Sequence, residues 1–147
     1  MKKSTLIMIA IVYIASIVLI SLFGMKAVVY NEVIPVTKIE CLNETDSKTE
    51  VYYSGDMKVI KVKFTEAGNA ETLKGTMVQL TYRVLPDNAS NKNIKYVYTE
   101  NSRVEFVKGE DGREVGLVLI KGQVVLKVKI MAMDGSKVYT EVVIWAY

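Results

Sequence analysis

Hydrophobic and polar positions divide the chain into two parts. Residues 5–24 contain no charged side chain and consist almost entirely of Leu, Ile, Val, Met, Ala and Phe. A helix of this length rises by about 30 Å, which matches the hydrocarbon core of a bilayer. Apolar side chains surround the predicted helix on all sides instead of forming one face. The segment is therefore predicted to cross a membrane and not to lie on its surface.

The charges that flank this segment predict its orientation. Lys2 and Lys3 precede it, whereas Lys26 follows it alone. The positive-inside rule places residues 1–4 in the cytoplasm and the C-terminal part outside the cell. A cleaved signal peptide is the alternative interpretation. Its apolar region would be shorter, about 7–15 residues, and would end in a site with small residues, so an uncleaved anchor is favoured.

After a predicted tether at residues 25–33, hydrophobic residues alternate with polar ones with a period of two. This alternation is typical of strands that have one packed and one solvated face. The segments between these strands carry turn signals, and no helical periodicity follows the anchor. The predicted strands span residues 34–42, 50–53, 57–64, 76–85, 94–99, 104–106, 115–120, 123–133 and 136–147. We therefore expect an all-β fold, an antiparallel sandwich or barrel.

The hydrophobic pattern gives more detailed predictions for two regions, a hairpin and a single strand. Residues 123–133 and 136–147 form the clearest hairpin, because Asp134-Gly135 is a favoured two-residue turn. The alternation in its second arm points Val142 and Ile144 to the core and Trp145 away from it. Residues 76–85 are predicted to form one strand, and the side chains expected on its packed face are Val78, Leu80, Tyr82 and Val84.

Residues 75–96 (GTMVQLTYRVLPDNASNKNIKY) resemble the bacterial Ig-like domain of group 2, the intimin/invasin-type module. Members have a strand that begins at Gly and ends at Pro, a short loop with Ala and Asn, and a strand with a core aromatic residue. Tyr96 stands at the place of that aromatic residue. Residues 121–128 and the Asp134-Gly135 hairpin resemble the closing strands. The resemblance covers residues 75–147, more loosely from residue 34, and implies an Ig-like β-sandwich over residues 34–147.

Two features depart from this family pattern. Tyr96 replaces the usual Trp, and residues 43–74 are longer than the usual connection after the first strand. We expect this insertion to add a hairpin. The family implies adhesion or spacing roles, usually in tandem arrays, whereas this chain has a single copy on a short tether. A partner in the same membrane or in the cell wall is therefore favoured over another cell.

The residue inventory argues against several functions. The chain has no histidine, and Cys41 is its only cysteine. The commonest general base is therefore missing, and one thiol cannot form a zinc site or an intramolecular disulfide. Cys41 is interpreted as buried, with a free thiol or a bond to another chain as alternatives. No phosphate-binding glycine loop is present. We expect no enzymatic activity, no catalytic residue, no metal and no cofactor.

Charge and aromatic content bear on the partners. Beyond the N-terminal lysines the net charge is close to +1, so nucleic-acid binding is not expected. Four aromatic residues are candidates for contact with a partner, because such rings combine a large contact area with a polar tip: Tyr52, Tyr53, Trp145 and Tyr147. The alternative is that the tyrosines only fill strand positions. Small side chains that would allow close packing of the membrane helix are Ala10, Ala15, Ser16 and Ser21.

These observations predict a protein held in the lipid bilayer by residues 5–24, with its C-terminal domain outside a bacterial cell. The first hypothesis is a binding or structural module that contacts protein or polysaccharide at the cell surface. The second is an accessory subunit of a membrane complex, in which the helix packs on other spans and the domain caps their outer face. An enzyme is the third and least favoured.

Overall fold

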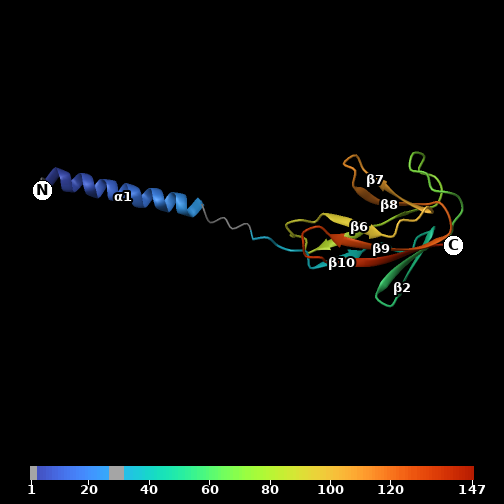
Figure 1. Ribbon diagram of the computed structural model, residues 1–147. Coiled ribbons are helices and arrows are strands. Elements are labelled where there is room, and N and C mark those ends of the chain that lie inside the picture. Colours follow the sequence, from blue (N-terminus) through green and yellow to red (C-terminus); the bar gives the residue numbers. More distant parts are fainter. Residues whose placement is uncertain (1–2, 27–31) are drawn as a thin grey trace. The chain divides into compact units, whose positions relative to one another are not determined.

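The computed structural model describes residues 3–26 and 32–147, and it separates the chain into two units (Figure 1). The first unit contains one helix, and the second begins at Val33 and contains all the strands. We call the second one the β unit.

The helix α1 spans Lys3–Lys26 and carries only apolar or small polar side chains through most of its length. It is long and apolar enough to cross a membrane. The helix extends two residues beyond each end of the predicted segment, 5–24, which is the usual uncertainty of a helix boundary read from sequence. Residues 25 and 26 of the predicted tether are thus helical, and its residues 27–31 lie outside the described part of the chain.

The β unit is built from short strands, as the period-two pattern predicts. They are β1 (Lys38–Cys41), β2 (Thr49–Ser54), β3 (Met57–Val62), β4 (Met77–Gln79), β5 (Tyr82–Leu85), β6 (Ile94–Tyr98), β7 (Val104–Lys108), β8 (Glu114–Ile120), β9 (Val124–Ala132) and β10 (Tyr139–Ala146). The protein is therefore mostly β, with one apolar helix at its N-terminus.

These strands form three sheets. The largest has the order β2-β3-β10-β9-β6, the second has the order β4-β8-β7, and β1 pairs with β5. All neighbours are antiparallel except β3 and β10, which run parallel. β7 and β8 lie on the opposite side of the β unit from β9 and β10 (Figure 1). The hairpin β2–β3 lies within the insertion at residues 43–74.

One cluster of buried side chains joins the three sheets. Its members come from nine strands and include Ile39, Ile60, Val78, Val84, Tyr96, Phe106, Val118, Val128 and Ile144. The alternation in β9 is strict, because every second residue from Val124 to Ala132 is buried. Full burial of one such aliphatic side chain stabilises the folded state by about 1.5–3 kcal/mol.

The structure corrects the prediction of a single strand over residues 76–85. β4 and β5 belong to different sheets, and the ladder is interrupted between them. At the interruption the Leu80 N–H donates to Gly116 O at 2.8 Å. The side chain of Asn43 donates to Gln79 O at 2.6 Å and accepts from the Thr81 N–H at 2.9 Å. These bonds replace the ladder partners that a continuous strand would have.

The predicted packed face of this segment is confirmed at three positions and wrong at one. Val78, Leu80 and Val84 are buried, but the side chain of Tyr82 is 37% exposed. Tyr82 follows the interruption and begins the two-stranded sheet with β1, where it lies opposite Cys41. The alternation therefore holds within each strand, but Tyr82 lies at the margin of the core.

The hairpin of β9 and β10 is confirmed, with a longer connection than predicted. Residues 133–138 join the strands, instead of a two-residue turn. The Asp134 carboxylate accepts from the N–H and hydroxyl of Ser136 and, at 2.6 Å, from the Val36 N–H. The carboxylate thus orders the turn and binds the segment before β1 to it. Val142 and Ile144 are fully buried and Trp145 is 38% exposed, as predicted.

Candidate functional site

The outer face of the five-stranded sheet brings together three of the four aromatic residues proposed from the sequence. Residues that lie directly opposite each other in a sheet share a face. Glu50 on β2 lies opposite Lys61 on β3, and Lys61 lies opposite Trp145 on β10. Alternation along the strands places Tyr52 and Tyr147 on this face as well. These five residues, Glu50, Tyr52, Lys61, Trp145 and Tyr147, are called the Lys61 cluster here.

The ammonium group of Lys61 occupies the centre of the cluster. Its Nζ lies 4.8 Å from the ring centroid of Tyr147 and 5.4 Å from that of Trp145. It also lies 3.3 Å from Glu50 Oε2. The two rings are tilted by 59° with centroids 6.2 Å apart, so they enclose the cation instead of forming one flat platform. Cation–π contacts of this kind contribute about 0.5–1 kcal/mol at exposed sites.

The electrostatics of the cluster favour the charged form of Lys61. The Glu50 carboxylate, through its hydrogen bond and its charge, raises the pKa of Lys61 above its usual value. The Lys61 side chain is 26% exposed and that of Glu50 is 63% exposed. Glu50 can therefore exchange this ion pair for another cation at little cost, because solvent screens an exposed pair.

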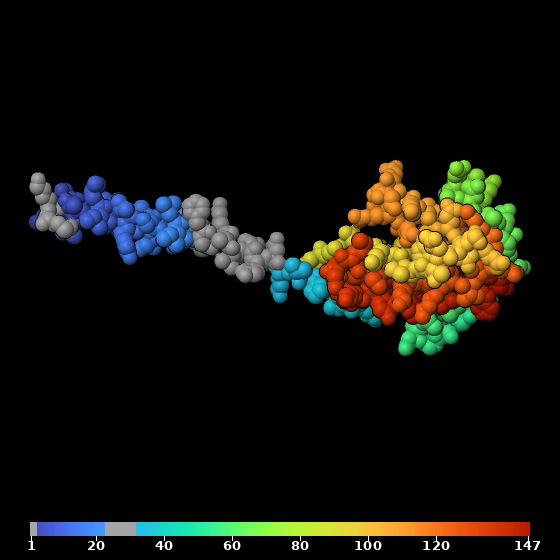
Figure 2. Space-filling model, in the orientation of Figure 1, coloured from blue at the N-terminus to red at the C-terminus, as the bar shows by residue number. Residues whose placement is uncertain are grey.

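The insertion contributes most of the cluster. Glu50, Tyr52 and Lys61 all come from the β2–β3 hairpin, whose turn projects from the surface of the β unit (Figure 2). Gly55 in that turn has a φ of +63°, a conformation that glycine adopts without strain. Thr45 Oγ1 accepts from the Val51 N–H at 2.9 Å and donates to Val51 O at 3.3 Å, which fixes the outer edge of β2.

Tyr53 lies apart from the cluster, because successive residues of a strand point to opposite faces. It lies opposite Lys58, whose Nζ is 5.7 Å from the Tyr53 ring centroid and donates to Cys41 O at 2.8 Å. Both residues line an open depression of about 420 Å³ between β1, the β2–β3 turn and the start of β10. Tyr53 is 70% exposed there.

Cys41 lines the same depression and is half-buried, which is less than the sequence interpretation expects. Its Sγ donates to Asn43 Oδ1 at 3.4 Å. Burial raises the pKa of the Cys41 thiol above its usual value. The thiol is therefore protonated near neutral pH, which makes it a poor nucleophile.

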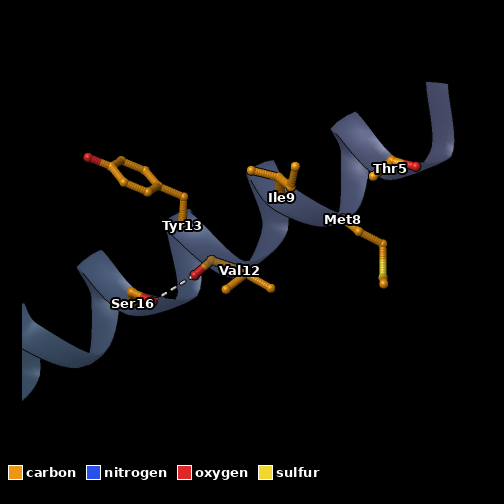
Figure 3. Close-up of a pocket in the computed structure, with 6 residues that line it drawn as sticks. All are labelled: Thr5, Met8, Ile9, Val12, Tyr13 and Ser16. Carbon is orange, nitrogen blue, oxygen red and sulfur yellow. Dashed lines mark hydrogen bonds between the residues drawn. The ribbon is translucent and has the colours of Figure 1, made fainter. Parts of the chain in front are cut away.

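The small residues proposed for helix packing do not form one stripe on α1. At 3.6 residues per turn, Ala10 and Ser21 lie within about 20° of each other around the axis. Ala15 and Ser16 lie about 140° and 240° from Ala10, on two other sides. The Ser16 hydroxyl donates to Val12 O at 2.8 Å, so its hydrogen bond is made within the helix (Figure 3).

The core aromatic residue expected from the family resemblance is buried. Tyr96 on β6 is 8% exposed, and its ring centroid lies 5.6 Å from that of Phe106 on β7. Burial raises its pKa. Its neighbour Tyr98 stacks on Phe106 at 4.0 Å and donates to Glu114 at 2.7 Å. Burial, followed by the contact with Glu114, raises the pKa of Tyr98 to about 12.

Lys61 and Glu50 are the functional candidates that the sequence reasoning missed. Lys61 alternates with buried residues of β3, which predicts only an outward-facing side chain. Its contact with Trp145 depends on the pairing of β3 with β10, whose residues are far apart in the sequence. Local patterns do not carry that information.

Within residues 3–26 and 32–147, no group of three or more His, Cys, Asp or Glu side chains is arranged to hold a metal ion. The described surface offers aromatic contact, hydrogen bonds and charge. Compared with known protein families and with curated protein sequences, the chain matches none.

Proposed function

We propose that the protein is a membrane-anchored, extracytoplasmic Ig-like module that contacts a protein or polysaccharide partner at a bacterial cell surface. In this proposal α1 crosses the membrane with its N-terminus in the cytoplasm. The β unit is a β-sandwich of the bacterial Ig-like kind, and the Lys61 cluster is its contact surface. No catalytic step, metal or cofactor is required.

The order of the strands supports an Ig-like sandwich. Immunoglobulin-type domains place strands A, B, E and D in one sheet and strands C, F and G in the other. With β1 as strand A, β4 and β5 as the two halves of strand B, and β6 to β10 as strands C to G, all the required pairs are present. They are β1-β5, β4-β8-β7 and β10-β9-β6. The inserted hairpin β2–β3 then extends the sheet beyond strand G.

A buried aromatic residue on strand C is a further hallmark of Ig domains, and Tyr96 on β6 has that position. The shared core cluster between the strands of the two larger sheets is what a sandwich requires. Neither feature is specific to the group 2 family, so the family assignment rests on the sequence resemblance.

The observation that carries the contact function is the assembly of the Lys61 cluster. An insertion in the fold supplies three of its residues, and Trp145 on the last strand and Tyr147 just after it supply two aromatic rings beside them. Tyrosine and tryptophan are enriched among the residues that contribute most to binding energy in protein interfaces. Because Lys61 lies between the tilted rings, this surface favours a protein partner that brings a carboxylate over one that stacks sugar rings flat.

Site-specific photo-crosslinking in intact cells tests this proposal. A photoreactive phenylalanine analogue replaces Tyr52 in one strain and Tyr53 in another. The two positions are adjacent in sequence and point to opposite faces, so position 53 is the matched control. We expect a crosslinked partner from position 52 and none from position 53. No product from position 52, or equal products from both, would refute the Lys61 cluster as the contact surface.

The same cells test the topology. A C-terminal tag must be digested by external protease once the cell wall is removed, while a cytoplasmic marker protein stays intact. A tag that remains protected would refute the proposed orientation.

The second candidate function is an accessory subunit of a membrane complex. The observation in its favour is that α1 carries hydroxyl side chains within an apolar span, which can bond to other spans. Extraction with a mild detergent after crosslinking separates the two functions. Recovery of one or two integral membrane proteins in fixed proportion would support the subunit, and recovery alone or with wall material would support the surface module.

A further inference from the structure

The helix α1 has a hollow on one face, and this face carries three of the four hydroxyl groups of residues 5–24. Figure 3 shows Tyr13 and Ile9 on one side of the helix and Met8 on the other, with Thr5 and Ser16 toward the two ends of this face. The groove, of about 370 Å³, is lined by Thr5, Met8, Ile9, Val12, Tyr13 and Ser16. It exists because short side chains in the middle are flanked by two long ones. Ser21, the remaining hydroxyl of the apolar segment, lies about 160° from Thr5 around the axis.

The spacing of the residues in the middle of the groove is that of a coiled-coil seam. Thr5, Ile9, Val12 and Ser16 follow one another at intervals of four, three and four residues. These intervals repeat every seven residues, so the side chains stay in line on a pair of helices that wind around each other with a left-handed twist. Membrane helices commonly pack in this way, with hydroxyl side chains at the interface.

We propose that α1 pairs with α1 of a second copy of this chain, in parallel, through this groove. The inference rests on the membrane placement proposed above. All copies insert in the same direction, so each seam residue meets its counterpart at the same depth. Met8 directly precedes the seam residue Ile9, and Tyr13 directly follows the seam residue Val12. In a parallel pair of helices, a residue in the first of these positions contacts the residue five places later on the facing helix. Met8 and Tyr13 are five residues apart and occupy those two positions.

This pairing is self-complementary. Met8 of each copy contacts the Tyr13 ring of the other, so one symmetric interface makes the sulfur–aromatic contact twice. It also removes Tyr13 from lipid. Tyrosine is favoured where a membrane meets water, yet Tyr13 lies near the middle of α1, which in the proposed placement is the apolar centre of the membrane. A facing helix with hydroxyl groups supplies the polar surroundings that lipid does not.

Cysteine crosslinking of the full chain in bacterial membranes tests the inference. In a Cys41→Ser background, Ser16→Cys places one thiol in the groove, and Ser21→Cys places one about 140° away around the axis and about 7.5 Å further along it. After oxidation with copper phenanthroline, we expect a disulfide-linked dimer from Ser16→Cys and a monomer from Ser21→Cys.

The outcomes separate this inference from the membrane placement. In one set of outcomes, the chain is in the membrane fraction while Ser16→Cys stays monomeric, links to a different protein, or dimerises no better than Ser21→Cys. Each of these results refutes pairing through the groove and leaves the membrane placement standing. If the chain is absent from that fraction, the membrane placement is refuted as well.

A second pair of variants measures the strength of the interface by fluorescence energy transfer between labelled copies of the chain in lipid bilayers. Ser16→Leu fills the groove and is expected to weaken pairing by about 3- to 18-fold, and Ser21→Leu to leave it unchanged.

Discussion

Replacing Gly116 by alanine should destabilise the β unit strongly, because two separate effects oppose a side chain there. Gly116 has a φ of +77°, which disfavours any residue with a Cβ by about 1–2 kcal/mol. A Cβ at this position would also lie 2.3 Å from the Tyr96 hydroxyl and 3.1 Å from Leu80 O. Overpacking of this kind costs about 1–3 kcal/mol. The expected total for Gly116→Ala is about 2–5 kcal/mol of unfolding free energy.

Gly112 provides a matched control. Its φ of +75° is almost the same, but a Cβ there would meet no atom within 4 Å. Gly112→Ala should therefore lose only the backbone part, about 1–2 kcal/mol. The difference between the two variants isolates the contact with Tyr96.

The measurement is urea unfolding of the full chain in detergent micelles, followed by the fluorescence of Trp145, which is the only tryptophan. Adding Tyr96→Phe to Gly116→Ala should restore part of the loss, because it removes the atom closest to the new Cβ. A double-mutant cycle should then give a coupling of about 1–2 kcal/mol. Equal losses for the two glycine variants, or no coupling, would refute this account of the Tyr96 site.

Three further predictions concern the core, the Lys61 cluster and the turn before β10. Ile144→Ala should cost about 2–5 kcal/mol in the same assay, because Ile144 is fully buried, whereas Val97→Ala at a 41% exposed position should cost less than about 0.5 kcal/mol. Lys61→Met should lower the urea midpoint slightly and change the emission of Trp145, while Lys63→Met, with its exposed side chain, should change neither. Hydrogen bonds from Ser136, and then from the Val36 N–H, hold the pKa of Asp134 below its usual value of 3.8. The ionised Asp134 carboxylate therefore stabilises the fold fully when the pH is above its usual pKa. This stabilisation is lost as the pH falls through the lowered pKa of the folded protein. Asp134→Asn should flatten the fall of the urea midpoint between about pH 5 and pH 2 relative to the parent chain, and a parallel fall in both proteins would contradict the role given to Asp134.

Local patterns predicted the elements of the fold well where one face of a strand is buried. β9 and β10 follow the alternation of Val124–Ala132 and of residues 142–146, because burial of every second side chain is a property of each strand by itself. The split between β4 and β5 could not be read in this way. It depends on Asn43 and Gly116, which are distant in sequence and supply hydrogen bonds in place of the ladder.

In the candidate site, too, some features follow from the local sequence pattern and others depend on residues that are distant in the sequence. That Tyr52 and Tyr53 face opposite ways follows from the period of a strand, so the sequence already implies that these two candidates do not share a surface. The meeting of Lys61 with Trp145 depends on parallel pairing between the insertion and the last strand. Pairing of that kind follows from packing of the whole β unit, which no short segment specifies.

The position of the inserted hairpin bears on how the protein avoids association between sheets. Without β2 and β3, strand β10 would be an outer strand with a long row of free backbone groups, and such edges recruit strands of other molecules into aggregates. With the insertion, β10 lies between β3 and β9, and the short β2 becomes the edge. Thr45 already occupies both the N–H and the carbonyl of Val51 at that edge. The insertion thus also shields the eight-residue strand β10 from intermolecular β-pairing.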